Sequence, residues 1–127
     1  MRITLVGLAA TALVAMFASP ASAKMETVTG VLVDQTCYLL NQANIRQKHV
    51  MKNGPVDNCA TTCAKKGETV AVVTPAGKMY VVVGQYTANK NRILVGYMTH
   101  TVNMTGDVST AKDGSATISA ISIKDVQ

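Results

Sequence analysis

The amino-acid sequence predicts a mainly β protein, a small five-stranded barrel with one helical, cysteine-containing insertion between its first two strands. Three observations support this prediction. Five runs rich in β-branched residues are separated by turn signals, as in small all-β domains. Residues 35–67, after the first run, lack the alternation of a strand and contain all three cysteines. A weaker helical pattern lies between the third and fourth runs.

The chain begins with the pattern of a secretory signal peptide. Arg2 precedes the apolar run Ile3–Phe17, and Ala21–Ala23 forms a small-residue cleavage site. The run is shorter than the roughly 20 apolar residues that span a bilayer, which argues against a transmembrane anchor. We therefore expect a signal peptide at residues 1–23, one mature domain at residues 24–127, and a periplasmic or secreted location.

The mature chain is mildly basic. Without Arg2, its 11 basic and 7 acidic residues leave a net charge of +4. A basic β-barrel suggests nucleic acid as a partner, but export argues against it, and so do the few aromatic residues on which bases could stack. We expect no nucleic-acid partner and interpret the basic residues of the insertion as a solvated face. They are Arg46, Lys48, Lys52, Lys65 and Lys66.

The first predicted strand is Thr27–Asp34, and Gly30 inside it suggests a bend or a bulge. Within the insertion, Pro55 fits the first turn of a helix, and Gly67 fits the position just after the last turn. We therefore predict a helix at about residues 55–66.

Two valine-rich runs follow the insertion, Glu68–Thr74 and Lys78–Gly84. They flank Pro75-Ala76-Gly77 and are predicted to form a hairpin. Residues 87–98 then have a weaker helical spacing of apolar side chains.

The last two predicted strands are His100–Val108 and Ala116–Lys124. Gly106 marks a second bend, and the apolar residues change phase between Ala120 and Ile121, which suggests a bulge. Five strands with a helix between the third and fourth is the order of an OB-type barrel. A small β-sandwich has a similar strand count and is the alternative.

Two motifs in this order resemble those of a family of small exported bacterial proteins, largely uncharacterised and with an OB-like strand order. The first is Asp-x-x-Cys-Tyr at residues 34–38, and the second is Cys-Ala-x-x-Cys-Ala at residues 59–64. The resemblance covers most of the mature chain and implies the same barrel. Members often carry a histidine three residues before the second motif, where this chain has Val56. A metal site that uses that histidine is therefore not implied here.

Three cysteines in an exported domain cannot all pair within the chain. On the predicted helix, Cys59 and Cys63 share a face with Cβ atoms about 5–6 Å apart, whereas a disulfide needs roughly 3.5–4.5 Å. Cys37 is then the natural partner for one of them, and such a staple would be worth on the order of 3 kcal/mol. Which of the two pairs with Cys37 stays open.

The alternative is that Cys37, Cys59 and Cys63 stay reduced and form a three-sulfur site suited to Cu(I) or Zn²⁺. His49 is a candidate fourth ligand. The weaker candidate ligands are the remaining histidine and three methionines: Met51, Met98, His100 and Met104. Methionine beside valine on an alternating strand is more often core filler than a ligand. Copper and zinc are the only cofactors that the sequence suggests.

Three functions are consistent with these features. The first is an exported, non-enzymatic OB-like binding or accessory module with a cysteine-stapled insertion and an unidentified ligand or protein partner. The second is a periplasmic protein that binds copper or zinc through three cysteines. The third is a thiol–disulfide redox protein, although Cys-x3-Cys is not the usual redox spacing. No nucleophile beside a base and no phosphate-binding glycine pattern points to catalysis.

Overall fold

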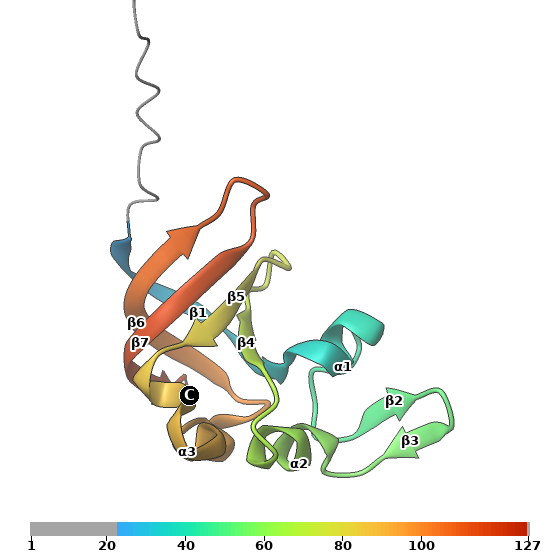
Figure 1. The fold of residues 1–127 in the computed structure, drawn as a ribbon. Helices are drawn as coiled ribbons and strands as arrows, with labels where there is room; N and C mark the ends of the chain where they lie inside the picture. Colours follow the sequence, from blue (N-terminus) through green and yellow to red (C-terminus); the bar gives the residue numbers. More distant parts are fainter. Residues whose placement is uncertain (1–22, 127) are drawn as a thin grey trace, which may run out of the picture.

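Five strands close into one barrel in the order β1-β4-β5-β7-β6 (Figure 1). The computed structural model describes residues 23–126. Strands β5 and β7 pair in parallel, and the other neighbouring strands pair antiparallel. The predicted OB-like barrel is confirmed, and the β-sandwich alternative is wrong because all five strands belong to one closed sheet. The strands are β1 (Lys24–Asp34), β4 (Val70–Val73), β5 (Met79–Val83), β6 (Thr101–Thr110) and β7 (Ala116–Asp125).

Apolar side chains fill the barrel because they alternate along its strands. In β6, Val102, Met104 and Val108 are buried, while Asn103 and Asp107 are exposed. Successive side chains of a strand point to opposite faces, so one face of β6 lines the core and the other meets water. Other members of this core are Val28, Leu32, Val72, Val82, Leu94 and Ile118.

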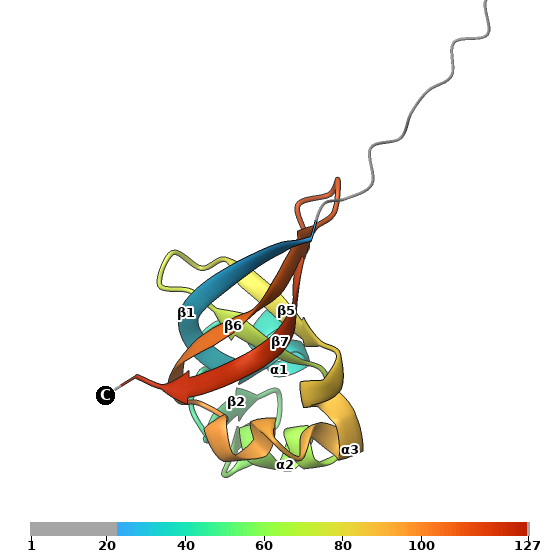
Figure 2. The same cartoon turned by 90° about the vertical axis from the view of Figure 1, so that its left-hand side faces the viewer.

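Strand β1 curls around the barrel and changes partner along its length (Figure 2). Its first part pairs with β6 and its last residues pair with β4. The predicted bend position, Gly30, lies where the strand passes from one partner to the other. A side chain at Gly30 would collide with the backbone of Val73, so glycine is required by this close approach.

The predicted bulge in the last strand is confirmed. Thr105 pairs with Ser122, but the next residue, Gly106, pairs with Ala120, which leaves Ile121 as the extra residue. A side chain at Gly106 would collide with the backbone of Ser119. Glycine and bulge together allow β6 and β7 to bend around the barrel.

The insertion between β1 and β4 contains two short helices and a two-stranded ribbon. Its elements are α1 (Gln35–Leu40), β2 (His49–Met51), β3 (Gly54–Val56) and α2 (Cys59–Lys65). The helix predicted at about residues 55–66 starts later than expected, because residues 54–56 pair with β2 as strand β3. Asn58, with φ of 52°, ends the non-helical stretch.

The C-terminal end of the same helix agrees with the prediction. Gly67 has φ of 88°, which favours glycine. Its N–H donates to the carbonyl of Ala64, and the N–H of Glu68 donates to the carbonyl of Cys63. The left-handed glycine therefore closes the helix as a C-terminal cap.

The single helix predicted at residues 87–98 is wrong. The segment is broken into η1 (Gln85–Thr87), α3 (Ala88–Asn91) and η2 (Leu94–Tyr97). Asn89, Lys90 and Asn91 all have positive φ, a conformation that interrupts a right-handed helix. Helices α2 and α3 lie side by side at one end of the barrel in both views (Figures 1 and 2).

Among residues 23–126, none of the helices is long and apolar enough to cross a membrane. The predicted signal peptide, apart from Ala23, lies outside the described residues.

Candidate metal centre

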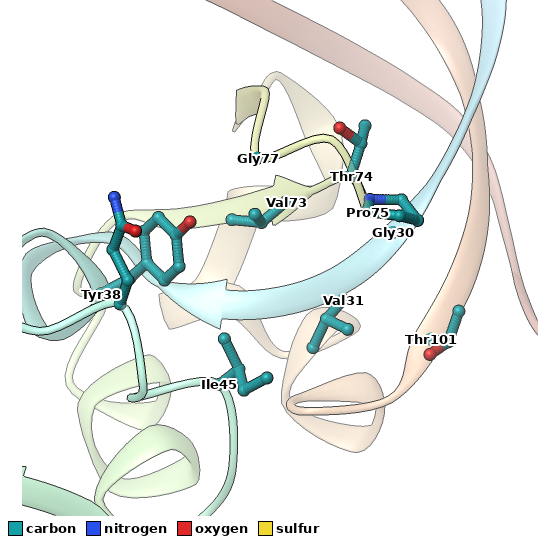
Figure 3. Close-up of a pocket in the computed structure, with 10 residues that line it drawn as sticks. Gly30, Val31, Tyr38, Ile45, Val73, Thr74, Pro75, Gly77 and Thr101 are labelled. Atoms are coloured by element: carbon teal, nitrogen blue, oxygen red, sulfur yellow. The ribbon is translucent and has the colours of Figure 1, made fainter.

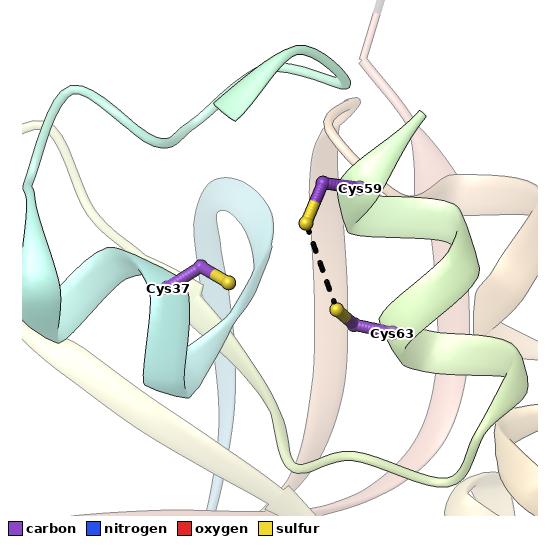
Figure 4. A group of neighbouring side chains, drawn as sticks. All are labelled: Cys37, Cys59 and Cys63. Atoms are coloured by element: carbon purple, nitrogen blue, oxygen red, sulfur yellow. Dashed lines mark hydrogen bonds between the residues drawn. The ribbon is translucent and has the colours of Figure 1, made fainter. Parts of the chain in front are cut away.

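Three cysteine sulfurs converge between helices α1 and α2 (Figure 4). The Sγ atoms of Cys37, Cys59 and Cys63 all lie within 4.8 Å of one another. The Sγ atoms of Cys59 and Cys63 are 3.7 Å apart. The prediction that these two share a helix face directed at Cys37 is confirmed. All three are free thiols, so the disulfide staple stays a prediction.

Cys37 is fixed on α1 by hydrogen bonds at both of its backbone groups. Asp34, the last residue of β1, caps the helix, because its Oδ1 accepts a hydrogen bond of 2.8 Å from the N–H of Cys37. The carbonyl of Cys37 accepts hydrogen bonds from the N–H of Asn41 and from Nδ2 of Asn44 (2.9 Å). Both polar partners, Asp34 and Asn44, are buried.

Helix α2 is held at its N-terminal end by one glutamine. The backbone carbonyl of Gln47 accepts a 2.8 Å hydrogen bond from the N–H of Cys59. Its side-chain Oε1 accepts hydrogen bonds from both the N–H and the hydroxyl of Thr61. Gln47 therefore fixes the turn of the helix that carries Cys59.

The C-terminal end and the inner face of α2 are fixed by other contacts. The Nδ2 of Asn91 donates to the carbonyls of Ala64 (3.0 Å) and Glu68 (2.8 Å). Ala60 and Ala64 are fully buried in the barrel core. The adjacent stripe of the helix, with Cys59 and Cys63, faces α1 (Figure 4).

Burial and negative charge both favour the protonated thiols. Burial, followed by the neighbouring Asp34 carboxylate, strongly raises the pKa of Cys37. Burial, the sulfur of Cys59 and the charge of Asp34 raise the pKa of Cys63 to about 11. At neutral pH these thiols are protonated, so a metal ion must displace protons to bind.

Two buried polar side chains near the cysteines each have an atom without a hydrogen-bond partner. They are Asp34, through Oδ2, and His49, through Nδ1, and both residues are only 1% exposed. Burial lowers the pKa of His49, while the charge of Asp34 and a hydrogen bond to the Arg46 carbonyl act in the opposite direction. His49, the predicted fourth ligand, lies at the start of β2 and outside the group of mutually close sulfurs.

The weaker predicted ligands are not brought to the cysteines as one set. Met98 and Met104 are buried in the barrel core, as expected for core filler. His100 precedes β6 and is exposed, and its Nδ1 lies 2.8 Å from Oδ1 of Asp125. His100 and the buried Met104 therefore do not form one ligand set. Met51 is half-buried on β2.

The sulfur geometry fits a thiolate metal site. Zn–S bonds of about 2.3 Å in a tetrahedral site place sulfurs about 3.8 Å apart. The observed 3.7 Å between Cys59 and Cys63 agrees with that spacing. Cys37, within 4.8 Å of both, needs to approach by at most about 1 Å. Soft thiolates suit Cu(I) and Zn²⁺ better than hard cations.

A separate pocket lies beside the barrel, between α1 and the β4–β5 turn (Figure 3). Its volume is about 380 Å³, and its walls include Val31, Tyr38, Ile45, Val73 and Pro75. The mainly apolar walls offer no pair of acid, base or nucleophile.

Asp34, Asn44 and Gln47 were not predicted as site residues. Only Asp34 had a sequence signal, because an Asp three residues before Cys37 is the spacing of a helix cap. The side-chain hydrogen-bond partners of Asn44 and Gln47 lie 6 or more residues away along the chain, beyond the reach of a helix or strand period. Comparison with models of protein families, with curated proteins and with solved structures finds no match.

Proposed function

We propose that this protein binds one soft or borderline metal ion, Cu(I) or Zn²⁺, through the thiolates of Cys37, Cys59 and Cys63. The observation that carries this proposal is the approach of all three sulfurs to within 4.8 Å, from two helices that separate hydrogen bonds hold in place. Two neighbouring sulfurs are common in structural disulfides, whereas a third sulfur within 4.8 Å supplies the three protein ligands of an open zinc site.

A disulfide staple remains the competing function of the same residues. A disulfide between Cys37 and either Cys59 or Cys63 uses two of the three sulfurs. The third sulfur would then have no role. A redox function is less well supported, because reactive cysteines have lowered pKa values, whereas here burial raises the pKa of Cys63 to about 11.

We further propose that the protein acts after export, as an OB-like binding or accessory module. The support is the signal-peptide pattern of residues 1–23. In an oxidising compartment, a bound ion would protect the three thiols, since coordinated sulfur is less available for disulfide formation. The insertion would carry the ion, and the barrel would serve as its scaffold.

The test is a titration of the reduced, metal-free protein with Co²⁺, a spectroscopic substitute for Zn²⁺ whose thiolate complexes absorb in the near ultraviolet. We expect one ion per chain, and a large loss of affinity in each of Cys37→Ser, Cys59→Ser and Cys63→Ser. Thr62→Ser, an exposed change on the same helix, is the matched control. If one of the three Cys→Ser changes leaves the metal affinity unchanged, the result would support the disulfide and contradict the three-cysteine metal site.

A further inference from the structure

Exposed apolar side chains gather on the insertion. Leu39 and Leu40, at the end of α1, are 65% and 70% exposed, and Val50 on β2 is 57% exposed. Leu40, Val50 and Met51 line one hollow of about 390 Å³, and so does Lys52. Single exposed apolar residues are common on protein surfaces, whereas a contiguous group marks an interaction site. We call Leu39, Leu40, Val50, Met51 and Lys52 the insertion patch.

The insertion also carries the whole net charge of the expected mature chain. Residues 35–67 contain five basic residues and one acidic residue, which gives a net charge of +4. The other mature residues, 24–34 and 68–127, contain six basic and six acidic residues and are neutral together. All five basic side chains of the insertion are exposed, and within residues 23–126 only Lys48 of these five forms an ion pair, with Asp57. The part of the molecule with the apolar patch therefore has an uncompensated positive charge.

The chemistry of the insertion patch fits a lipid surface better than a protein surface. Protein interfaces are enriched in aromatic residues and arginine and depleted in lysine. The patch instead combines leucine and valine with lysine, as do protein segments that lie at a membrane surface, where aliphatic side chains enter the acyl boundary and lysines meet anionic headgroups. Helix α1 and the β2–β3 ribbon project from the barrel on the same side, which leaves the patch open to such an extended surface (Figure 1).

We propose that the insertion patch attaches this protein to the surface of an anionic lipid bilayer. Leu39, Leu40 and Val50 enter the outer part of the acyl layer, and Lys52 with the other basic residues of the insertion contacts the phosphate headgroups. Both contributions are needed, because stable attachment to a bilayer generally takes two signals. Cys37 lies on the same helix as the two leucines, so the attachment holds the cysteine site close to the bilayer. The inference uses none of the cysteines and does not depend on the proposed metal binding.

The test is cosedimentation of the protein with vesicles of phosphatidylcholine alone, or of phosphatidylcholine mixed in equal parts with phosphatidylglycerol, an anionic lipid. The protein is purified after export, and its mass is measured to verify removal of the signal peptide. We expect binding to the mixed vesicles and little binding to phosphatidylcholine alone. Raising the salt concentration should weaken the binding, because salt screens the attraction between lysines and headgroups.

Substitutions separate the apolar and the electrostatic contributions. Leu39→Ser combined with Leu40→Ser should weaken binding to the mixed vesicles roughly tenfold or more, because two aliphatic side chains no longer enter the acyl layer. Lys52→Ala should weaken it about fivefold, the effect of one basic residue near an anionic surface. Ile121→Ser and Lys112→Ala are the matched controls, since they change exposed side chains outside the insertion, and they should leave the binding unchanged.

Binding to anionic vesicles that is weakened in the patch variants and kept in the controls supports the inference. Equal binding to both kinds of vesicle, equal loss in patch and control variants, or no binding to vesicles overturns it. Dimerisation of the protein that Leu40→Ser abolishes, seen by analytical ultracentrifugation in a protein that does not bind vesicles, would assign the patch to a second copy of the chain and also overturns it. If the double leucine variant does not fold, Val50→Ser supplies the same comparison, since Val50 is exposed as well.

Discussion

The barrel and the insertion are held together by different interactions. In the barrel, apolar side chains such as Leu32, Met104 and Ile118 are fully buried and the strands form a closed hydrogen-bonded sheet. In the insertion, the main contacts join side chains to backbone groups, as at Asp34, Asn44 and Gln47. Hydrophobic burial supports the barrel throughout, whereas the insertion combines a few buried apolar residues, such as Ala60 and Ala64, with polar contacts at specific places.

This difference teaches where stability and function are located. Proteins open locally with free energies that range from near zero to the full free energy of unfolding. We expect the barrel to belong to the most stable part of this molecule and the insertion to open at lower cost. A ligand that joins α1 to α2 would then stabilise the less stable region. The predictions below test whether the two regions respond separately, from the largest expected effect to the smallest.

The largest effect is expected from Leu32→Ala in the barrel core. Leu32 is fully buried, and shortening such a side chain costs about 2–5 kcal/mol of unfolding free energy. Chemical denaturation with and without Zn²⁺ measures this loss and the stabilisation that the ion adds. The stabilisation by the ion should be unchanged while the folded state persists. If the stabilisation by Zn²⁺ decreases together with the unfolding free energy of the barrel, the barrel and the insertion do not respond separately.

Metal removal should have the next largest effect, and it should act on the insertion. Zn²⁺ at about 100 times its dissociation constant adds about 2.7 kcal/mol to the unfolding free energy, and a chelator should reverse the gain. Amide hydrogen exchange should locate the added protection at α1 and α2. Protection that rises equally in the barrel and the insertion would mean that the ion acts on the whole fold. Cys63→Ser is the control that should show no gain.

Asn44→Ala should weaken the insertion by about 1–3 kcal/mol, because buried backbone groups lose their partners. Asn44 joins the carbonyl of Cys37 to the N–H of Val50, at 2.9 and 2.8 Å. Hydrogen exchange should speed up at α1 and β2 and stay unchanged in β6 and β7. A uniform increase would show that this residue supports the barrel as well.

A smaller effect is expected from pH in the metal-free protein. Burial raises the pKa of Cys63 from 9.0 to about 11, so between these values the folded state keeps a proton that the unfolded chain has lost. Stability is therefore fully present below about pH 9 and falls as the pH rises toward 11. Urea midpoints from pH 8 to 11 should decline more steeply in wild type than in Cys63→Ser. If the urea midpoints of the two proteins decline equally with pH, Cys63 does not contribute to the pH dependence of stability.

The smallest effect is expected at the exposed pair of His100 and Asp125. Both side chains are about half exposed, at 50% and 48%. Even a fully charged exposed pair contributes only about 0.2–1 kcal/mol, so Asp125→Asn should lower the unfolding free energy by no more than that. Zn²⁺ affinity should stay the same. A change in affinity would return His100 to the set of candidate ligands.

The sequence predicted the barrel more accurately than the insertion for a physical reason. Strand runs such as Ala116–Lys124 show their period locally, and the phase change at Ile121 marks a bulge within the same run. The predicted helix start at Pro55 was wrong, because residues 54–56 pair with residues 49–51 as a strand. This pairing depends on contact with another segment and not on the local helix propensity of residues 54–56. The helix at residues 87–98 failed because three consecutive residues, Asn89–Asn91, adopt positive φ.

The candidate site was predictable in part. The helical spacing of Cys59 and Cys63, together with Cys37 just after the first predicted strand, was sufficient to predict that the sulfurs converge. The buried polar partners were not, because the hydrogen bonds of Asn44 and Gln47 depend on the folded path of the insertion. A residue that acts through a distant backbone group leaves no periodic or motif signal in the chain.

The central claim is that the three cysteines form one metal site. Native mass spectrometry of the reduced protein with Zn²⁺, followed by thiol alkylation with and without the ion, tests it most directly. The claim predicts one Zn²⁺ per chain and protection of Cys37, Cys59 and Cys63 together, lost again on chelation. Binding of no ion, or alkylation of the three cysteines at rates that the ion does not change, would contradict it.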